Sequence, residues 1–130
     1  MAELKGNLII RAMRRTINAY EFNTKRKHII KLLKEADIIE NPDNVKKYVD
    51  FCYYNQEKEP GHGIGTQYSV DRHHIIPKCI IKNKNIDTSK IYEGANNARL
   101  SKPNHIIAHK MLLEISKDEY KKYFKSFENM

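Results

Sequence analysis

Four of the six histidines in this 130-residue chain fall between positions 71 and 109, in two pairs of different spacing. His73 and His74 are adjacent, in a segment whose apolar and β-branched residues predict a strand. His105 and His109 are four residues apart, in a segment with the apolar pattern of a helix. The two pairs suit a small metal site with one imidazole left over for proton transfer.

The spacing within each pair decides where the side chains point. Residues four apart on a helix lie on one face, so His105 and His109 can both bind one metal ion. Neighbours on a strand point to opposite faces, so one of His73 and His74 can complete the site while the other stays free. Asp71 shares the strand face of His73 and could bind the metal or accept a hydrogen bond from His73. An inert structural zinc site is the alternative at this point.

The residues before this region predict a helical scaffold. Apolar residues recur at helical spacing over residues 4–22, 25–37 and 43–55, which places Thr24 at the N-cap of the second helix. A polar, glycine-rich linker at 57–65 follows and separates these helices from the histidine region.

Past the linker the pattern changes to short strands and a strong helix. We expect one or two strands around the histidine pair, a connection over 78–96, a return strand at 97–100, a helix over 102–116 and a last helix over 117–127. Ser101 is the expected N-cap of the 102–116 helix. The prediction is an α+β, mostly helical fold with three parts: a helical region and linker (1–66), a histidine module (67–116) and a C-terminal helix (117–130).

Charge and composition narrow the class of protein. The chain carries 24 lysines and arginines against 16 acidic residues, a net charge of +8, with the excess toward both ends of the sequence. Such a surface favours binding to a polyanion. No apolar run approaches the roughly 20 residues that span a bilayer, so no membrane association is expected, and the N-terminus lacks a signal-peptide pattern. Cys52 and Cys79 form no metal-binding pair and are expected to be reduced thiols in the cytoplasm.

The ordered set of motifs resembles the HNH endonuclease family, whose typical core reads Arg-His-His-Ile-x-Pro-Lys, then Asn-Leu-Val-x-Leu, then Glu-His-x-x-x-His-x-Leu-Leu. The matching stretches are Arg72-His73-His74-Ile75-Ile76-Pro77-Lys78, Asn97-Ala98-Arg99-Leu100-Ser101 and Asn104-His105-Ile106-Ile107-Ala108-His109-Lys110-Met111-Leu112-Leu113. The resemblance is closest to small, free-standing phage-type members and covers about residues 68–115. The chain departs from the pattern at Cys79, where the family has glycines, and at Asn104, where it has an acid.

The resemblance implies a ββα-metal module and a role for each matching residue. One divalent metal ion is expected on His73, His105 and His109, with Asp71 as an auxiliary ligand or hydrogen-bond acceptor. His74 is expected to be the general base, and Asn97 to tie the hairpin together and orient His74. Three imidazoles favour Zn²⁺ or Ni²⁺, whereas a bound Asp71 carboxylate would favour Mg²⁺ or Mn²⁺.

The implied activity is hydrolysis of DNA phosphodiester bonds, by nicking or double-strand cleavage, to leave 5′-phosphate and 3′-hydroxyl ends. Flanking phosphates are expected to contact Arg72, Lys78, Arg99, Arg14 and Arg15. The expected location is the cytoplasm of a bacterial host, for a phage-encoded protein whose oligomeric state is open. Two alternatives stay open: a nucleic-acid-binding module with a structural zinc, and an inactive nuclease fold that inhibits a host protein.

Overall fold

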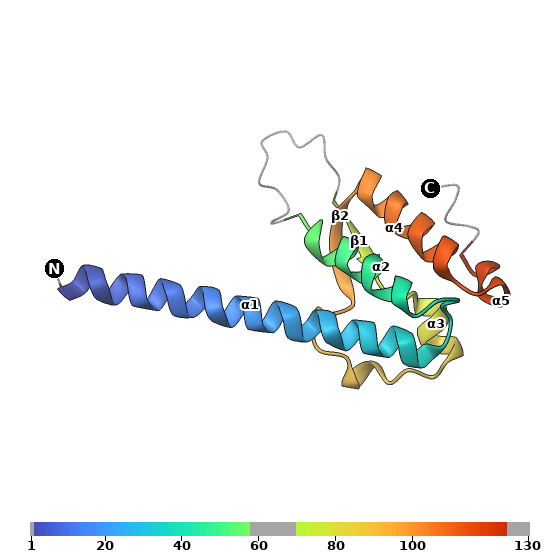
Figure 1. Cartoon of the computed structure of the whole chain (residues 1–130), viewed down its shortest axis with the longest axis horizontal. Helices are drawn as coiled ribbons and strands as arrows, with labels where there is room; N and C mark the ends of the chain where they lie inside the picture. The colour runs from blue at the N-terminus through green and yellow to red at the C-terminus, as the bar shows by residue number, and fades with distance from the viewer. Residues whose placement is uncertain (1, 58–69, 125–130) are drawn as a thin grey trace.

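The computed structural model describes the backbone of residues 2–57 and 70–124, and side chains within those ranges from residue 19 onward. It is a mixed α+β fold (Figure 1). The elements in chain order are α1 (Ala2–Ala36), α2 (Asp43–Tyr54), β1 (Val70–His74), α3 (Lys78–Asn83), the 3-10 helix η1 (Thr88–Lys90), β2 (Asn97–Ser101), α4 (Lys102–Ile115) and α5 (Asp118–Lys121). Among the described helices, none has the length and apolar character needed to cross a membrane.

One continuous helix, α1, replaces the two helices predicted over 4–22 and 25–37. Thr24 is not an N-cap, because its hydroxyl donates to the carbonyl oxygen of Tyr20 one turn earlier, at 2.8 Å. This bond satisfies the hydroxyl in mid-helix, so a polar residue there need not end the helix. The second half of α1 packs against α2, while its N-terminal half extends away from the other elements (Figure 1).

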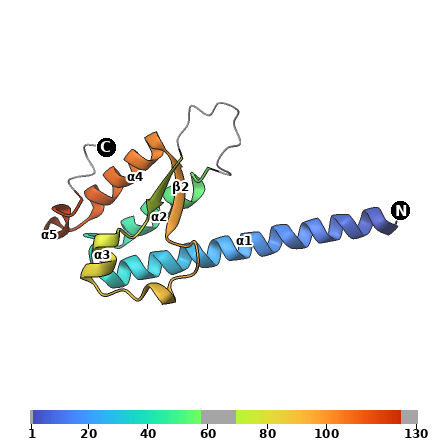
Figure 2. The same cartoon turned by 180° about the vertical axis from the view of Figure 1, so that it is seen from behind.

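Two antiparallel strands, β1 and β2, confirm the predicted hairpin around the histidine pair. In their register His73 pairs with Ala98 and His74 pairs with Asn97. The predicted connection over 78–96 is more ordered than expected, since it contains α3 and η1. Figure 2 shows the strand pair beside α4, and this proximity places the two histidine pairs near each other.

The helix that carries the second histidine pair, α4, confirms the predicted helix and its cap. The backbone N–H of Asn104 donates to Oγ of Ser101 at 3.3 Å, as expected for a serine N-cap. The predicted last helix is shorter in the structure, where α5 covers only Asp118–Lys121 and residues 125–130 lie outside the described part. The linker predicted at 57–65 also lies outside the described residues, apart from Glu57.

The hydrophobic core joins the N-terminal helices to the strands and α4. Its largest fully buried hydrophobic side chains come from α1 and the segment after it, α2, the segment after β1, α3, β2, α4 and the chain after α5: Ile29, Leu33, Ile38, Val45, Tyr48, Ile75, Ile76, Ile80, Leu100, Leu112 and Phe124. Burial of this many aliphatic and aromatic side chains is the main stabilising contribution to the fold. The histidine region and the described N-terminal helices therefore share one core.

Candidate metal and catalytic site

Three histidines converge where β1 packs against α4. One ring nitrogen from each of His73, His105 and His109 lies within 4.8 Å of the others. Nε2 of His105 and Nε2 of His109 are 2.9 Å apart, so both could lie at the ~2.0–2.1 Å that a zinc–imidazole bond requires. The sequence spacing predicts that His105 and His109 join one of His73 and His74, the resemblance implies His73, and the three residues fit a single divalent metal ion.

The tautomer of His73 follows from its contact with Tyr48 on α2. The hydroxyl of Tyr48 lies 2.8 Å from Nε2 of His73 and 2.8 Å from the carbonyl oxygen of Ile75. A carbonyl oxygen only accepts, so the single hydroxyl proton goes to Ile75, and Nε2 of His73 has to donate to Tyr48. The other nitrogen, Nδ1, then keeps its lone pair. It is buried without a hydrogen-bond partner among the described residues, as a metal ligand would be.

Tyr48 is fully buried, and burial raises the pKa of its hydroxyl well above the usual value. The hydroxyl therefore keeps the proton that it donates to Ile75. Sequence reasoning missed this residue, because it lies 25 positions before His73 on a helix with no motif of its own. Only the packing of α2 on the hairpin brings the two together.

We expect Tyr48→Phe to weaken zinc binding by about tenfold or more, because it removes the group that sets the His73 tautomer. The matched control is Tyr53→Phe on the same helix. Its buried hydroxyl donates to the carbonyl oxygen of Ala95 and touches no histidine. Competition with a chromophoric chelator measures both affinities, and an equal loss in the two variants would contradict the assigned role.

Asp71 lies behind His105 instead of beside His73. Its Oδ2 is 3.1 Å from Nδ1 of His105, and this carboxylate accepts a hydrogen bond from that nitrogen. The predicted hydrogen bond from His73 to Asp71 is therefore wrong, because the partner of the carboxylate is His105, and Asp71 is not among the three residues whose ligand atoms converge. With its proton on Nδ1, His105 offers the lone pair of Nε2 to a metal ion.

Burial keeps two of the clustered histidines, His73 and His109, neutral. Burial, and then the neighbouring His109 and His105, lower the pKa of His73 to about 3. Burial and then His105 lower the pKa of His109 to about 4. Since only neutral imidazole binds a metal, the two side chains are ready to act as ligands at neutral pH.

The lowered pKa values predict that the metal-free protein loses stability in mild acid. The unfolded chain takes up protons on these histidines below about pH 6.5, while the folded chain does not until about pH 3–4. His73 alone is expected to lower the free energy of unfolding by about 2 kcal/mol between pH 7.5 and 5. The exposed carboxyls Asp37 and Asp87 have lowered pKa values, so their contribution falls off only in stronger acid.

Urea unfolding in EDTA at the two pH values measures this loss. A free energy of unfolding that stays constant or rises as the pH falls to 5 would contradict the assigned burial of the neutral cluster.

His74 is not part of the group of three converging histidines, but it faces the same cleft as two of them. It lines a cleft of about 450 Å³ together with His105 and His109. Burial, and then the positive charges of Lys78 and Arg72, lower the pKa of His74 below its usual value, which keeps the ring neutral at pH 7. A neutral imidazole at the edge of a candidate metal site can accept a proton there.

The asparagine that ties the hairpin together is Asn96, and the role predicted for Asn97 is corrected. The buried Asn96 side chain accepts from the backbone N–H of Ile76 at 2.6 Å and donates to the Ile76 carbonyl oxygen at 3.0 Å. The Asn97 side chain is exposed and makes no hydrogen bond to the described residues. The signal for Asn96 was its spacing, since it precedes Leu100 by four, as the asparagine precedes the leucine in Asn-Leu-Val-x-Leu.

Asn96→Ala is expected to lower the free energy of unfolding by about 2–4 kcal/mol, because it leaves a buried N–H and a buried carbonyl of Ile76 without partners. The neighbouring Asn97→Ala is expected to change stability by no more than about 0.5 kcal/mol, as exposed substitutions usually do. Denaturant unfolding of the two variants compares them directly. Similar losses of stability in the two variants, or a larger loss in Asn97→Ala, would contradict the role of Asn96 and favour Asn97 as the residue that holds the hairpin together.

The predicted DNA-contacting residues group partly around His74. Arg72 pairs with Arg99 across the strands, both are exposed, and strand alternation puts them on the face of His74. The exposed Lys78 lines the cleft that contains His74. Arg14 and Arg15 lie on α1 before the first described side chain, so their predicted contacts fall outside the described residues.

Comparison of the chain with protein-family models, with curated proteins and with solved structures gives no significant match.

Proposed function

We propose that this protein is a metal-dependent DNA endonuclease of the HNH type, with a ββα-metal module formed by β1, β2 and α4. The observation that carries the proposal is the cleft in which His74 lies beside His105 and His109. Structural zinc sites are closed by four protein ligands, whereas only three imidazoles converge here and His74 is not among them, so one coordination position is left open beside a neutral imidazole. A hydrolytic site needs that fourth ring as a base.

In the proposed reaction, a ring nitrogen of His74 takes a proton from a water molecule as its oxygen attacks the phosphorus atom of a DNA phosphodiester. The bond from phosphorus to the 3′ oxygen of the preceding nucleotide breaks and that oxygen takes a proton from solvent, which leaves 5′-phosphate and 3′-hydroxyl ends. The bound metal would supply positive charge where negative charge develops on the phosphate oxygens and the leaving oxygen. Arg72 and Arg99 hold flanking phosphates on the same face of the hairpin.

The ligand set favours a transition metal over magnesium. The side chains that converge are three imidazoles, and Asp71 engages the far nitrogen of His105. Nitrogen ligands favour Zn²⁺ or Ni²⁺, whereas Mg²⁺ prefers oxygen ligands and binds fewer imidazoles. Mn²⁺ and Mg²⁺ are included in the cleavage assay below, because the metal that supports catalysis can differ from the metal that binds most tightly.

The test is incubation of the full chain with supercoiled plasmid and, separately, Zn²⁺, Ni²⁺, Mn²⁺ or Mg²⁺, with an EDTA control. Nicked or linear DNA that forms with a metal and not with EDTA supports the proposal, and end-labelling of the products identifies the 5′-phosphate. Absence of cleavage with every metal, on plasmid and on single-stranded DNA alike, would overturn it in favour of a non-catalytic role.

A further inference from the structure

Two clefts on the side of His74 adjoin each other. The first, of about 510 Å³, is lined by residues that include His74, Lys78, Lys82 and Tyr92. The second, of about 380 Å³, is lined by Tyr92, Lys25 and Tyr20 among others. Both include Tyr92 and Glu93, so the two clefts border each other at these residues, one reaching His74 and the other reaching α1. We name this surface the α1 groove.

Exposed aromatic rings stand at two points along the α1 groove. Tyr20 is 73% exposed and Tyr92 is 51% exposed, so part of each ring is open to solvent. Tyr92 is also held in place, because its ring lies against that of His28 on α1, with 4.5 Å between ring centroids. A braced ring with an open face can act as a stacking platform.

Lysines accompany the rings along the groove. Lys78 and Lys82 line its His74 end, and Lys25 lines its α1 end. The Lys25 ammonium lies close to the loop before β2. Its Nζ would be 3.8 Å from a Cβ atom added to Gly94 in that loop. Two carboxylates, Glu21 and Glu93, also line the groove near Tyr92. Carboxylates repel phosphates but accept hydrogen bonds from base amino groups, so they suit a ligand that turns its bases toward the α1 end.

We propose that the α1 groove binds an unpaired DNA strand next to the scissile phosphate, with a base stacked on Tyr92 and another on Tyr20. This proposal rests on the proposed nuclease function, because the strand in the α1 groove is the part of the DNA substrate that continues from the phosphate cleaved at His74. Each cleft has a volume in the range of about 300–1,000 Å³ that small-molecule sites occupy, which leaves room for a nucleobase.

An unpaired strand fits these features better than a duplex. Bases in a duplex stay stacked on one another, so exposed tyrosines have no base face to contact there, while unpaired bases stack on aromatic side chains. A surface that only held duplex phosphates would need cations and hydrogen-bond donors alone. The expected substrates are therefore single-stranded DNA, or duplex DNA with an unpaired segment at the cleavage site.

The experiment measures binding without metal or cleavage. Fluorescence anisotropy in EDTA compares a short single-stranded oligonucleotide with a duplex of the same length, for the full chain and its variants. Tyr92→Ala is expected to weaken single-strand binding about tenfold, and Tyr92→Phe is expected to retain it, because the ring face stays. The matched control is Tyr54→Ala, another exposed tyrosine (66% exposed) that lies outside the α1 groove.

The outcomes separate this proposal from the nuclease proposal. A loss in Tyr92→Ala that neither Tyr92→Phe nor Tyr54→Ala shows supports the groove, whether or not the protein cuts DNA. Equal single-strand affinities for Tyr92→Ala and Tyr54→Ala would contradict single-strand binding in the α1 groove, even if metal-dependent cleavage is found. Preference for the duplex in the unaltered chain, with no effect of Tyr92→Ala, also overturns it.

Discussion

His74→Ala is expected to slow metal-dependent DNA cleavage by about 10²–10⁴-fold, the usual contribution of a positioned general base. The ring is partly exposed in an open cleft and has no hydrogen bond among the described residues, so its removal should leave the fold intact. Metal affinity should also stay close to that of the unaltered chain, because the three clustered histidines remain. Single-turnover cleavage and chelator competition measure the two quantities separately.

Chemical rescue sharpens this test. Because His74 lines an open cleft, added imidazole should enter the space left by His74→Ala and restore part of the activity. A variant that cleaves as fast as the unaltered chain would remove His74 from the reaction. A variant that loses its metal together with its activity would make His74 a ligand instead of a base.

His109→Ala is expected to weaken metal binding by more than about 100-fold, since loss of a mere hydrogen-bond partner of a ligand already costs 10–100-fold. Only two of the three converging imidazoles would remain. Cleavage should fall with metal occupancy, and higher metal concentrations should recover part of it. Calorimetric titration with Zn²⁺ and the thermal shift on metal addition measure the effect.

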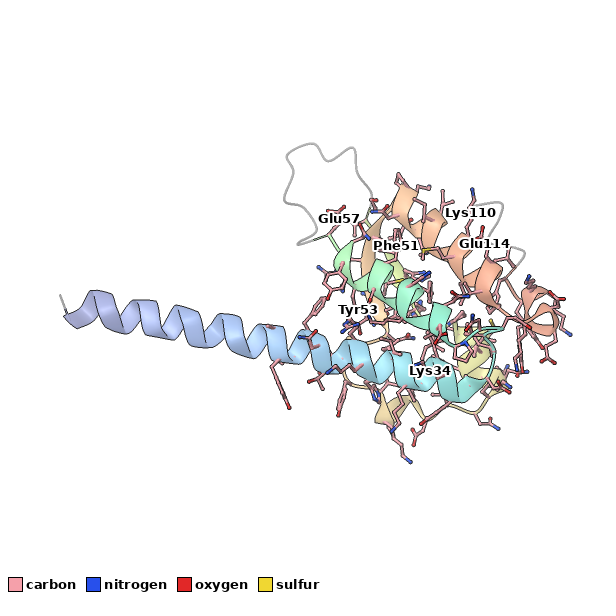
Figure 3. All side chains as sticks on the ribbon, viewed as in Figure 1. Lys34, Phe51, Tyr53, Glu57, Lys110 and Glu114 are labelled. Carbon is pink, nitrogen blue, oxygen red and sulfur yellow. The ribbon has the colours of Figure 1, made fainter. Side chains whose placement is uncertain are left out.

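The matched control for this variant is Lys110→Ala, at the next position of α4. Lys110 is exposed and lies on the outer side of that helix (Figure 3), so its removal should leave metal affinity unchanged. Equal zinc affinity in His109→Ala and Lys110→Ala would exclude His109 from the metal site.

Local sequence patterns predicted the elements that hold the site. Apolar and β-branched residues around the histidine pair and the 97–100 segment predicted the two strands, and the apolar run after Ser101 predicted α4 with its cap. The i, i+4 spacing placed His105 and His109 on one helix face, and the structure brings His73, which the family resemblance implied as a ligand, beside them. These predictions succeed because period and capping are properties of neighbouring residues.

The parts that the sequence did not predict depend on packing between distant segments. Thr24 has the chemistry of an N-cap, yet its hydroxyl bonds within α1 and the helix continues. Tyr48 reaches His73 only because α2 packs on the hairpin. Asn96 and Asn97 are chemically identical, and burial on one side of the hairpin decides which one bonds to Ile76.

A titration of cleavage rate against metal equivalents shows whether one metal ion in the three-histidine site drives DNA hydrolysis. In this titration the chain is first stripped of metal, Zn²⁺ or Ni²⁺ is added in steps, and the initial rate of plasmid cleavage is measured at each step. We predict a rate that rises linearly and levels off at one metal ion per chain, as a single three-histidine site requires. A rate that stays at zero throughout, or that is already maximal in the stripped protein, would contradict it.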